Sequence, residues 1–335
     1  MKLKMLNKGW YKSWVLPYID TYGKSLEAVS VREGRARFRI GTIDTPLLEM
    51  TSLRDLYVCP LCLNRVVYRH QEYLDLLHKF ELEFDFNVDH YPPEAIGGKD
   101  KILVCEVCNN KFGTTIDAAA KKFLEARFFF AGVNNSYIHM KIDAPWHKKP
   151  ISGLTYWRDG VITTELRRGF NPPTIEPGPG PLQVQYSGKY PHDKIFRKAL
   201  LRSAYLKCFA AWGYDFASSS IGKRLIAVFK DELEYPTESY GVFFTTSESY
   251  DNGIFQFENG GEIYFVVYFK IGIEEIPHYE NVFVIIPSNT ERSWEGLKYL
   301  TRDNKQTTLK GQLVPVKETV ADGHFHRYRR DTKDR

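Results

Sequence analysis

The sequence Cys59-Pro60-Leu61-Cys62 has a counterpart in Cys105-Glu106-Val107-Cys108, and the two pairs enclose Asp89-His90-Tyr91-Pro92-Pro93. Two residues between thiolates is the spacing at which one chain segment spans two corners of a tetrahedral Zn²⁺ site, with Zn–S distances of ~2.3 Å. Each pair therefore predicts one half of a structural Cys₄ zinc site, made by Cys59, Cys62, Cys105 and Cys108.

Other uses of paired cysteines fit this sequence less well. A single CxxC is also typical of thioredoxin-like redox pairs, but that interpretation leaves the second pair unexplained. A disulfide framework is typical of small secreted domains, and an intracellular chain of 335 residues is not one. The fifth cysteine, Cys208, falls on the apolar face of a predicted helix, where we expect it to fill space in the core.

The segment between the cysteine pairs carries hard oxygen ligands and a histidine in a fixed order. Asp-His is followed by two prolines, then by Gly97-Gly98, a short apolar strand, and a second CxxC that runs into Asn109-Asn110. An Asp-His dipeptide by itself most often closes a hairpin turn. Here it lies between the two CxxC pairs, and that setting favours a chemical role.

In this order of elements the sequence resembles the HNH endonuclease family, the His-Me finger or ββα-metal nucleases that carry a Cys₄ zinc knuckle. The resemblance covers about residues 57–117 of 335. It implies a treble-clef-like finger in which His90 is the general base that activates water, while Asp89 and Asn109 hold one Mg²⁺ or Mn²⁺. The family's middle asparagine is replaced here by Asp100, which can still accept a hydrogen bond, and its last histidine is replaced by Asn109.

The resemblance implies hydrolysis of phosphodiester bonds, with double-stranded DNA as the expected partner. Two alternatives stay open: a non-catalytic treble-clef zinc module that binds nucleic acid or protein, and a nuclease directed at RNA. HNH proteins of this size commonly serve in restriction, anti-phage defence or mobile elements, and that analogy is made at the level of the fold only.

Helical and strand patterns place the finger in an α+β chain. Residues 10–30 have helical spacing that Pro17 is expected to interrupt, and a helix is predicted at 193–216, followed by a short one near 222–231. Strands are predicted at 241–245, 254–258, 262–271 and 281–286, which gives a mostly antiparallel C-terminal sheet. We expect five parts: an N-terminal helix and strand segment (1–56), the nuclease finger (57–130), a β-rich connection with a Pro/Gly linker (131–182), a C-terminal α+β domain (183–320) and a basic flexible tail (321–335).

Charge and hydropathy limit the partners. The net charge of +5 leans only slightly toward polyanions, and a helix from Thr115 would present Lys121, Lys122 and Arg127 either to a phosphate backbone or to solvent. Residues 231–280 hold eleven acids against one base, Lys270, so the C-terminal domain is predicted to contact a protein or a second copy rather than DNA. The apolar runs are strand-sized, and no leader is apparent, so we expect a cytoplasmic protein without membrane contact.

Overall fold

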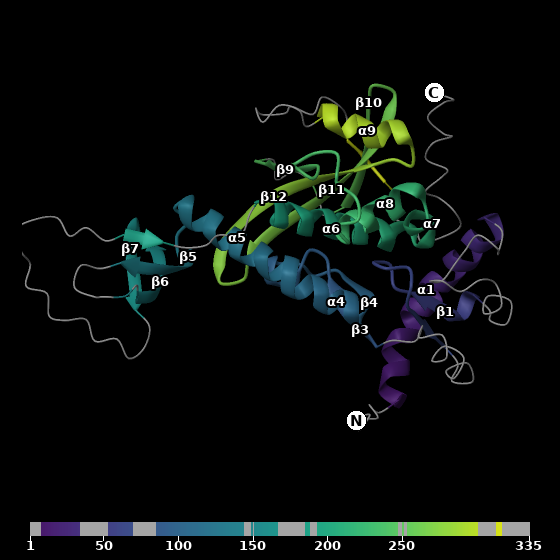
Figure 1. The fold of residues 1–335 in the computed structure, drawn as a ribbon, viewed down its shortest axis with the longest axis horizontal. Coiled ribbons are helices and arrows are strands. Elements are labelled where there is room, and N and C mark those ends of the chain that lie inside the picture. The colour runs from purple at the N-terminus through teal and green to yellow at the C-terminus, as the bar shows by residue number, and fades with distance from the viewer. Residues whose placement is uncertain are drawn as a thin grey trace, which may run out of the picture.

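The computed structural model is an α+β fold built on antiparallel sheets (Figure 1). Its longest strands are two neighbours in one sheet, and two of its helices pack beside them. The structure describes residues 8–33, 53–69, 85–143, 149, 151–166, 185–187, 193–246, 250, 253–300 and 313–316.

A five-stranded antiparallel sheet forms the C-terminal half, with strand order β13-β10-β11-β12-β9. Its centre is the hairpin β11–β12, in which Val267 pairs with Val284 and both strands are buried over most of their length because their sequences are almost continuously apolar. The predicted strands are confirmed, although the last one begins five residues earlier because the hairpin closes tightly between Ile273 and Ile276. The bounds are β9 Val242–Thr245, β10 Gly253–Asn259, β11 Glu262–Ile273, β12 Ile276–Pro287 and β13 Val314–Pro315.

Helices cover both faces of this sheet (Figure 1). Neighbouring residues of a strand point to opposite faces. Accordingly, Phe265 contacts Trp212 of α6, with ring centroids 4.8 Å apart, whereas the Tyr264 hydroxyl lies against Gly296 of α9. The helix predicted at 193–216 is divided at Gly213, which has a positive φ, into α6 Asp193–Trp212 and α7 Tyr214–Ala217. The short helix predicted near 222–231 is confirmed as α8 Ser220–Phe229, and α9 Glu291–Leu300 was not predicted.

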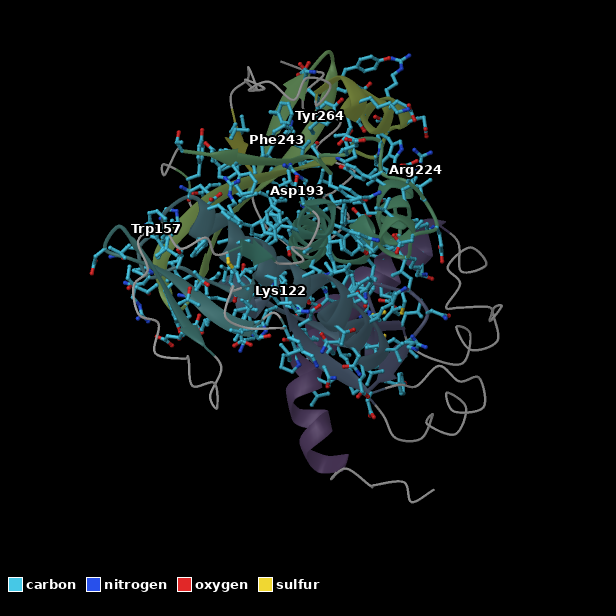
Figure 2. The ribbon with its side chains drawn as sticks, turned by 60° about the vertical axis from the view of Figure 1, so that its left-hand side comes forward. Lys122, Trp157, Asp193, Arg224, Phe243 and Tyr264 are labelled. Carbon is cyan, nitrogen blue, oxygen red and sulfur yellow. The ribbon has the colours of Figure 1, made fainter. Side chains whose placement is uncertain are left out.

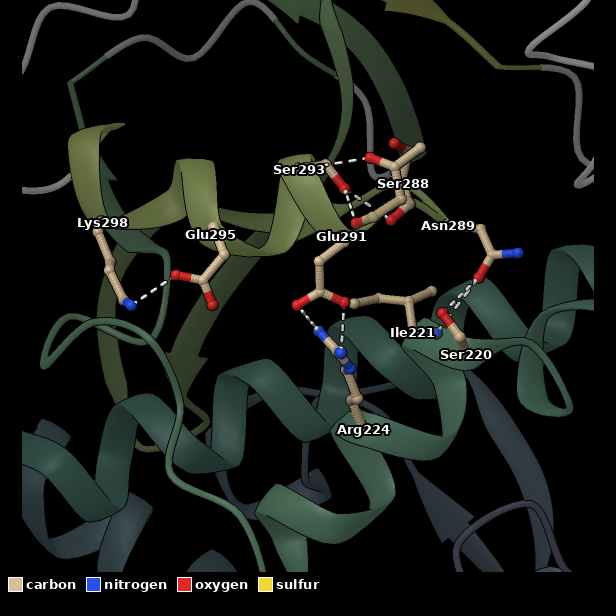
Figure 3. A network of polar contacts seen from close by, with 10 residues as sticks. Ser220, Ile221, Arg224, Ser288, Asn289, Glu291, Ser293, Glu295 and Lys298 are labelled. Atoms are coloured by element: carbon tan, nitrogen blue, oxygen red, sulfur yellow. Dashed lines mark hydrogen bonds and ion pairs between the residues drawn. The ribbon is translucent and has the colours of Figure 1, made fainter.

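A polar network joins α8 to the start of α9 (Figure 3). Arg224 of α8 donates two hydrogen bonds to the carboxylate of Glu291, and Asn289 accepts one from the Ser220 hydroxyl at 3.0 Å. Figure 2 labels Arg224 of α8 and Tyr264 of β11 in the C-terminal half. The network therefore fixes α8 to the start of α9.

The segment from Leu56 to Phe130, called the finger below, consists of two short hairpins followed by a helical stretch without a gap. β3 and β4 pair in antiparallel register, with Asp89 opposite Ile102 and His90 opposite Lys101. The helix that follows β4 contains a π-helical turn in its middle, and its last segment extends away from the finger (Figure 1). The bounds are β1 Leu56–Val58, β2 Val66–Tyr68, β3 Phe86–His90, β4 Lys101–Cys105, α4 Glu106–Phe112, the π turn Gly113–Asp117 and α5 Ala118–Phe130, with 3-10 turns at Leu53–Asp55 and Glu94–Ile96.

The N-terminal helix α1 (Lys8–Glu33) continues through Pro17, so the prediction of an interruption there was wrong. A proline inside a helix costs about 3 kcal/mol. The helix nevertheless buries one continuous stripe against the finger, and this tertiary packing offsets the lost hydrogen bond. The stripe consists of Val15, Ile19, Tyr22, Leu26 and Val29.

A separate four-stranded sheet lies at the far end of α5 (Figure 1), with order β7-β6-β5-β8. Its small core contains Phe129 of α5 together with Ile138 and Met140, and Trp157 packs against it (Figure 2). This sheet corresponds to the predicted β-rich connection. Its strands are β5 Tyr137–Asp143, β6 Ile151–Arg158, β7 Val161–Leu166 and β8 Gln185–Ser187.

One hydrophobic core connects α1, the finger and the C-terminal half. Helix α6 carries much of that connection, since Tyr205 on it donates a hydrogen bond to the carbonyl of Pro60 at 2.6 Å. The division into domains at 57–130 and 183–320 stays a prediction. The strand expected in the N-terminal segment, the Pro/Gly linker and the basic tail lie outside the described residues. Within the part that the structure describes, no helix has both the length and the apolar character needed to cross a membrane.

Tyr214 supplies a test of this connection. Its buried hydroxyl donates to the carbonyl of Val58 and accepts from the Val58 N–H, both at 2.6 Å. We expect Tyr214→Phe to lower the free energy of unfolding by about 1–3 kcal/mol, because two backbone groups lose their buried partner. Denaturant unfolding measures the change, and Tyr299→Phe, on an exposed ring, should stay within about 0.5 kcal/mol of wild type. Equal stability of the two variants would contradict the role given to Tyr214.

Candidate functional site

The four predicted zinc ligands converge on one point. Cys59 and Cys62 lie in the turn after β1, Cys105 ends β4, and Cys108 lies in the first turn of α4. Their sulfur atoms all lie within 4.8 Å of one another, and those of Cys62 and Cys105 are 4.0 Å apart. A zinc tetrahedron with Zn–S distances of ~2.3 Å has edges of about 3.8 Å. The four cysteines can therefore hold a zinc ion.

Hydrogen bonds and burial act in opposite directions on the thiols of the cluster. The Cys105 N–H donates to Cys59 Sγ at 3.3 Å. Leu63, which follows the first CxxC pair, adopts a positive φ of 52° that turns the chain there. Hydrogen bonds from the thiols of Cys108, Cys59 and Cys62 hold the pKa of Cys105 below its usual range, whereas burial raises the pKa of Cys59. Cys208 is buried on α6 and is not one of the four cluster thiols.

Asp89 and His90 occupy opposite faces of β3, as alternation along a strand requires. His90, at the end of β3, keeps 19% of its side chain exposed, and its Nδ1 lies 3.9 Å from a carboxylate oxygen of Glu94. Asp89 points the other way into the molecule and is only 5% exposed. The imidazole is therefore open to a solvent molecule, while the carboxylate is held by the protein.

The partner of Asp89 is Arg202 of α6, which the sequence did not indicate. Arg202 Nη1 donates to Asp89 Oδ2 at 2.5 Å, and Nη2 donates to both carboxylate oxygens of Asp117 at 2.6 and 2.8 Å. The guanidinium is 1% exposed and lies 5.3 Å from the centre of the Phe112 ring. One buried cation thus joins β3, the π turn and the C-terminal half.

Charge and burial compete in this cluster. Burial raises the pKa of Asp117 to about 6, against the lowering effect of Arg202 and with the Asp89 carboxylate raising it further. Burial opposes the charged form of Arg202 as well, but Asp89 and Asp117 outweigh it, and the pKa of the guanidinium is raised. Arg202 therefore stays protonated throughout the physiological range.

Asn109 and Asp100 do not take part in the hydrogen bonds of that cluster. Asn109 is partly exposed on α4, its carbonyl accepts from the Gly113 N–H, and its side-chain amide makes no hydrogen bond to a described residue. Asp100 is exposed in the loop before β4, where its carboxylate lies 3.4 Å from Lys207 Nζ and its carbonyl accepts from the Tyr91 N–H at 3.0 Å. Among its recorded contacts Asp100 ties the loop to α6, and none of them reaches Asp89.

The basic face predicted on the helix from Thr115 lies on α5 and is only partly exposed to solvent. Lys122 is exposed on α5 (Figure 2). Arg127, by contrast, forms an ion pair with Glu280 of β12 at 2.6 Å and lies 3.9 Å from the centre of the Phe244 ring. Of the two alternatives given for Arg127, a phosphate backbone or solvent, neither includes the contact that it makes between α5 and the C-terminal sheet.

The Gly97-Gly98 loop needs its glycines for two different reasons. Gly97 has a φ of +88°, a left-handed conformation that favours glycine, and a Cβ on Gly98 would overlap the backbone of Pro92. The loop therefore fixes the chain just after His90.

Substitution at these positions tests the loop. We expect Gly98→Ala to cost about 2–3 kcal/mol of unfolding free energy, since backbone on both sides must move. Gly113→Ala is the matched control: it has a helical φ of −56° and nothing within 4 Å, so it should be neutral or stabilise by up to about 1 kcal/mol. Thermal unfolding of both variants separates the cases, and a Gly98→Ala protein as stable as wild type would disprove the close approach.

Among the described residues, the four cysteines are the group of side chains that could hold a metal ion. Four thiols fit zinc, while one carboxylate oxygen of Asp89 and the amide oxygen of Asn109 are ligands of the kind that Mg²⁺ or Mn²⁺ takes together with water. Asp89 Oδ2 is engaged by Arg202, so Oδ1 is the oxygen left for such an ion.

Comparisons of the chain with protein-family models, with curated proteins and with solved structures found no match in any of the three.

Proposed function

We propose that this protein is a metal-dependent endonuclease of the HNH type that hydrolyses phosphodiester bonds in DNA. One observation carries the proposal: an antiparallel hairpin ends its first strand on a partly exposed His90 and leads through the zinc-ligand pair into a helix that bears Asn109. The four converging cysteines support it, because they hold both hairpins and the helix start in one frame.

His90 would act as the general base. Its ring is exposed enough to receive a water molecule, and a carboxylate oxygen of Glu94 lies 3.9 Å from Nδ1. Asp89 and Asn109 would hold a divalent cation, which would stabilise charge on the phosphate and the leaving oxygen. The close approach of Gly98 to the Pro92 backbone supports the chain two residues after His90.

A panel of substrates tests the proposal. The zinc-bound full chain is incubated with supercoiled, linear and single-stranded DNA and with RNA, each with Mg²⁺ or Mn²⁺. We expect the DNA substrates to be cleaved to products with 5′-phosphate and 3′-hydroxyl ends. Cleavage of RNA alone would replace DNA as the substrate, and no cleavage of any substrate would refute the nuclease.

A second candidate function is a zinc module that binds nucleic acid or a protein without cutting. The observation in its favour is the buried ion pair of Asp89 with Arg202, which occupies one oxygen of the proposed metal ligand. This alternative predicts binding that persists in EDTA and no turnover with any divalent ion. The same panel, analysed for mobility shifts as well as products, distinguishes the two.

A further inference from the structure

Arg202 reaches the proposed cation site from a helix more than a hundred positions away in the chain. It binds Asp89 through one nitrogen and Asp117 through another, so that each carboxylate has its own side of the guanidinium. A planar guanidinium fixes the direction of a carboxylate more tightly than an ammonium can. The arrangement sets the orientation of the Asp89 side chain, because Oδ2 accepts a hydrogen bond from Arg202 and Oδ1 does not.

Asp117 is placed by the π turn. An α-helix takes about 3.6 residues for one turn and a π turn takes about one more. The eight residues from Asn109 to Asp117 therefore complete about two turns, which puts both side chains on the same side of the helix. That side is where Arg202 lies, since it bonds to Asp117.

The charges of the cluster do not cancel. When both carboxylates are ionised, the one guanidinium leaves a net charge of about −1 in a largely buried site. If Arg202 faced Asp89 alone, its charge would repel a dication at that carboxylate. With Asp117 balancing Arg202, the charge of Asp89 is still available to a cation.

We propose that Arg202 is a positioning residue for the Asp89 carboxylate, and that Asp117 neutralises Arg202 so that Asp89 Oδ1 can bind a divalent cation. The inference rests on the proposed function, since it concerns the same site. Hydrogen-bonding partners of metal ligands typically change metal affinity by about 10–100-fold when they are removed. The C-terminal half therefore completes the cation site of the finger.

The first test measures Mn²⁺ binding to the zinc-bound full chain by electron paramagnetic resonance, without nucleic acid. Asp117→Asn is expected to raise the Kd for Mn²⁺ by about 10-fold, while the zinc content and the melting temperature report that the fold is kept. The matched control is Asp231→Asn, which breaks the 2.5 Å ion pair that Lys198 makes on the same helix α6 and should leave the Kd unchanged. Unchanged Mn²⁺ affinity in Asp117→Asn would overturn the proposal.

Two further measurements apply even if Asp117→Asn does not fold. Arg202→Lys keeps the charge but cannot hold both carboxylates, so we expect it to weaken Mn²⁺ binding by about 10-fold, and wild-type affinity would count against the proposal. In wild-type crystals with Mn²⁺, the ion should lie on Asp89 Oδ1 with Oδ2 still bonded to Arg202. An ion that displaces Arg202, or that is absent from Asp89, would overturn it. A wild type that binds Mn²⁺ in this way but cleaves nothing would refute the nuclease and not this inference.

Discussion

Replacing Cys105 by serine is expected to release the zinc and to unfold the finger together with much of the core. Cys105 ends β4, precedes α4 and lies 4.0 Å from Cys62, so its loss opens the cluster at the junction of hairpin and helix. Structural zinc contributes about 10–16 kcal/mol of apparent binding free energy in zinc-finger peptides. Because the finger and the C-terminal half share one core, we expect a loss of stability well above the about 3 kcal/mol that most single substitutions reach.

Metal analysis and thermal unfolding measure this effect. The wild type should carry one zinc per chain, Cys105→Ser should carry none, and its cooperative transition should be lost or strongly lowered. Cys208→Ala is the matched control because Cys208 is equally buried but lies outside the cluster, so it should keep its zinc. Retention of one zinc per chain in Cys105→Ser would rule out the proposed ligand set.

His90→Ala is expected to reduce cleavage by at least about 100-fold while zinc content and stability are kept. General base catalysis typically contributes about 10²–10⁴-fold, and His90 is the imidazole at the end of β3. The side chain is partly exposed and contacts Glu94 only at 3.9 Å, so its removal should leave the packing of the hairpin intact.

Initial rates of plasmid nicking, at a saturating concentration of Mg²⁺, give the size of the effect. His139→Ala serves as the control, because His139 is exposed on β5 in the separate small sheet and should not affect the rate. If the His90→Ala protein cuts as fast as the wild type, the base has been assigned to the wrong residue.

The cysteine cluster and the C-terminal strands could be predicted because both depend on local patterns. CxxC spacing specifies half a metal site within four residues, and the apolar runs of β11 and β12 are long enough to require burial on both faces. The continuation of α1 through Pro17 could not be predicted in this way, since it depends on the stripe that the helix buries against the finger.

The Asp89–Arg202 ion pair could not be predicted from the sequence either, because it also depends on tertiary packing. Nearly every position of α6 from Phe196 onward is buried, and the sequence of the helix does not show which side chain Arg202 binds. Its partners are 113 and 85 positions away, and only the packing of α6 on the finger brings the three side chains together. Arg127 shows the converse error, because a charge assigned to the surface by helical spacing is bound by Glu280 of a distant strand.

The central claim is that a cation site at Asp89, His90 and Asn109, held in place by the cysteine cluster, cuts phosphodiester bonds. Its most direct test is the conversion of supercoiled plasmid by the zinc-bound wild type as free Mg²⁺ is added back from zero. The account predicts no conversion without Mg²⁺ and a saturable increase of nicked product as Mg²⁺ rises. Plasmid that is bound in a mobility shift yet stays supercoiled at every Mg²⁺ and Mn²⁺ concentration would contradict it.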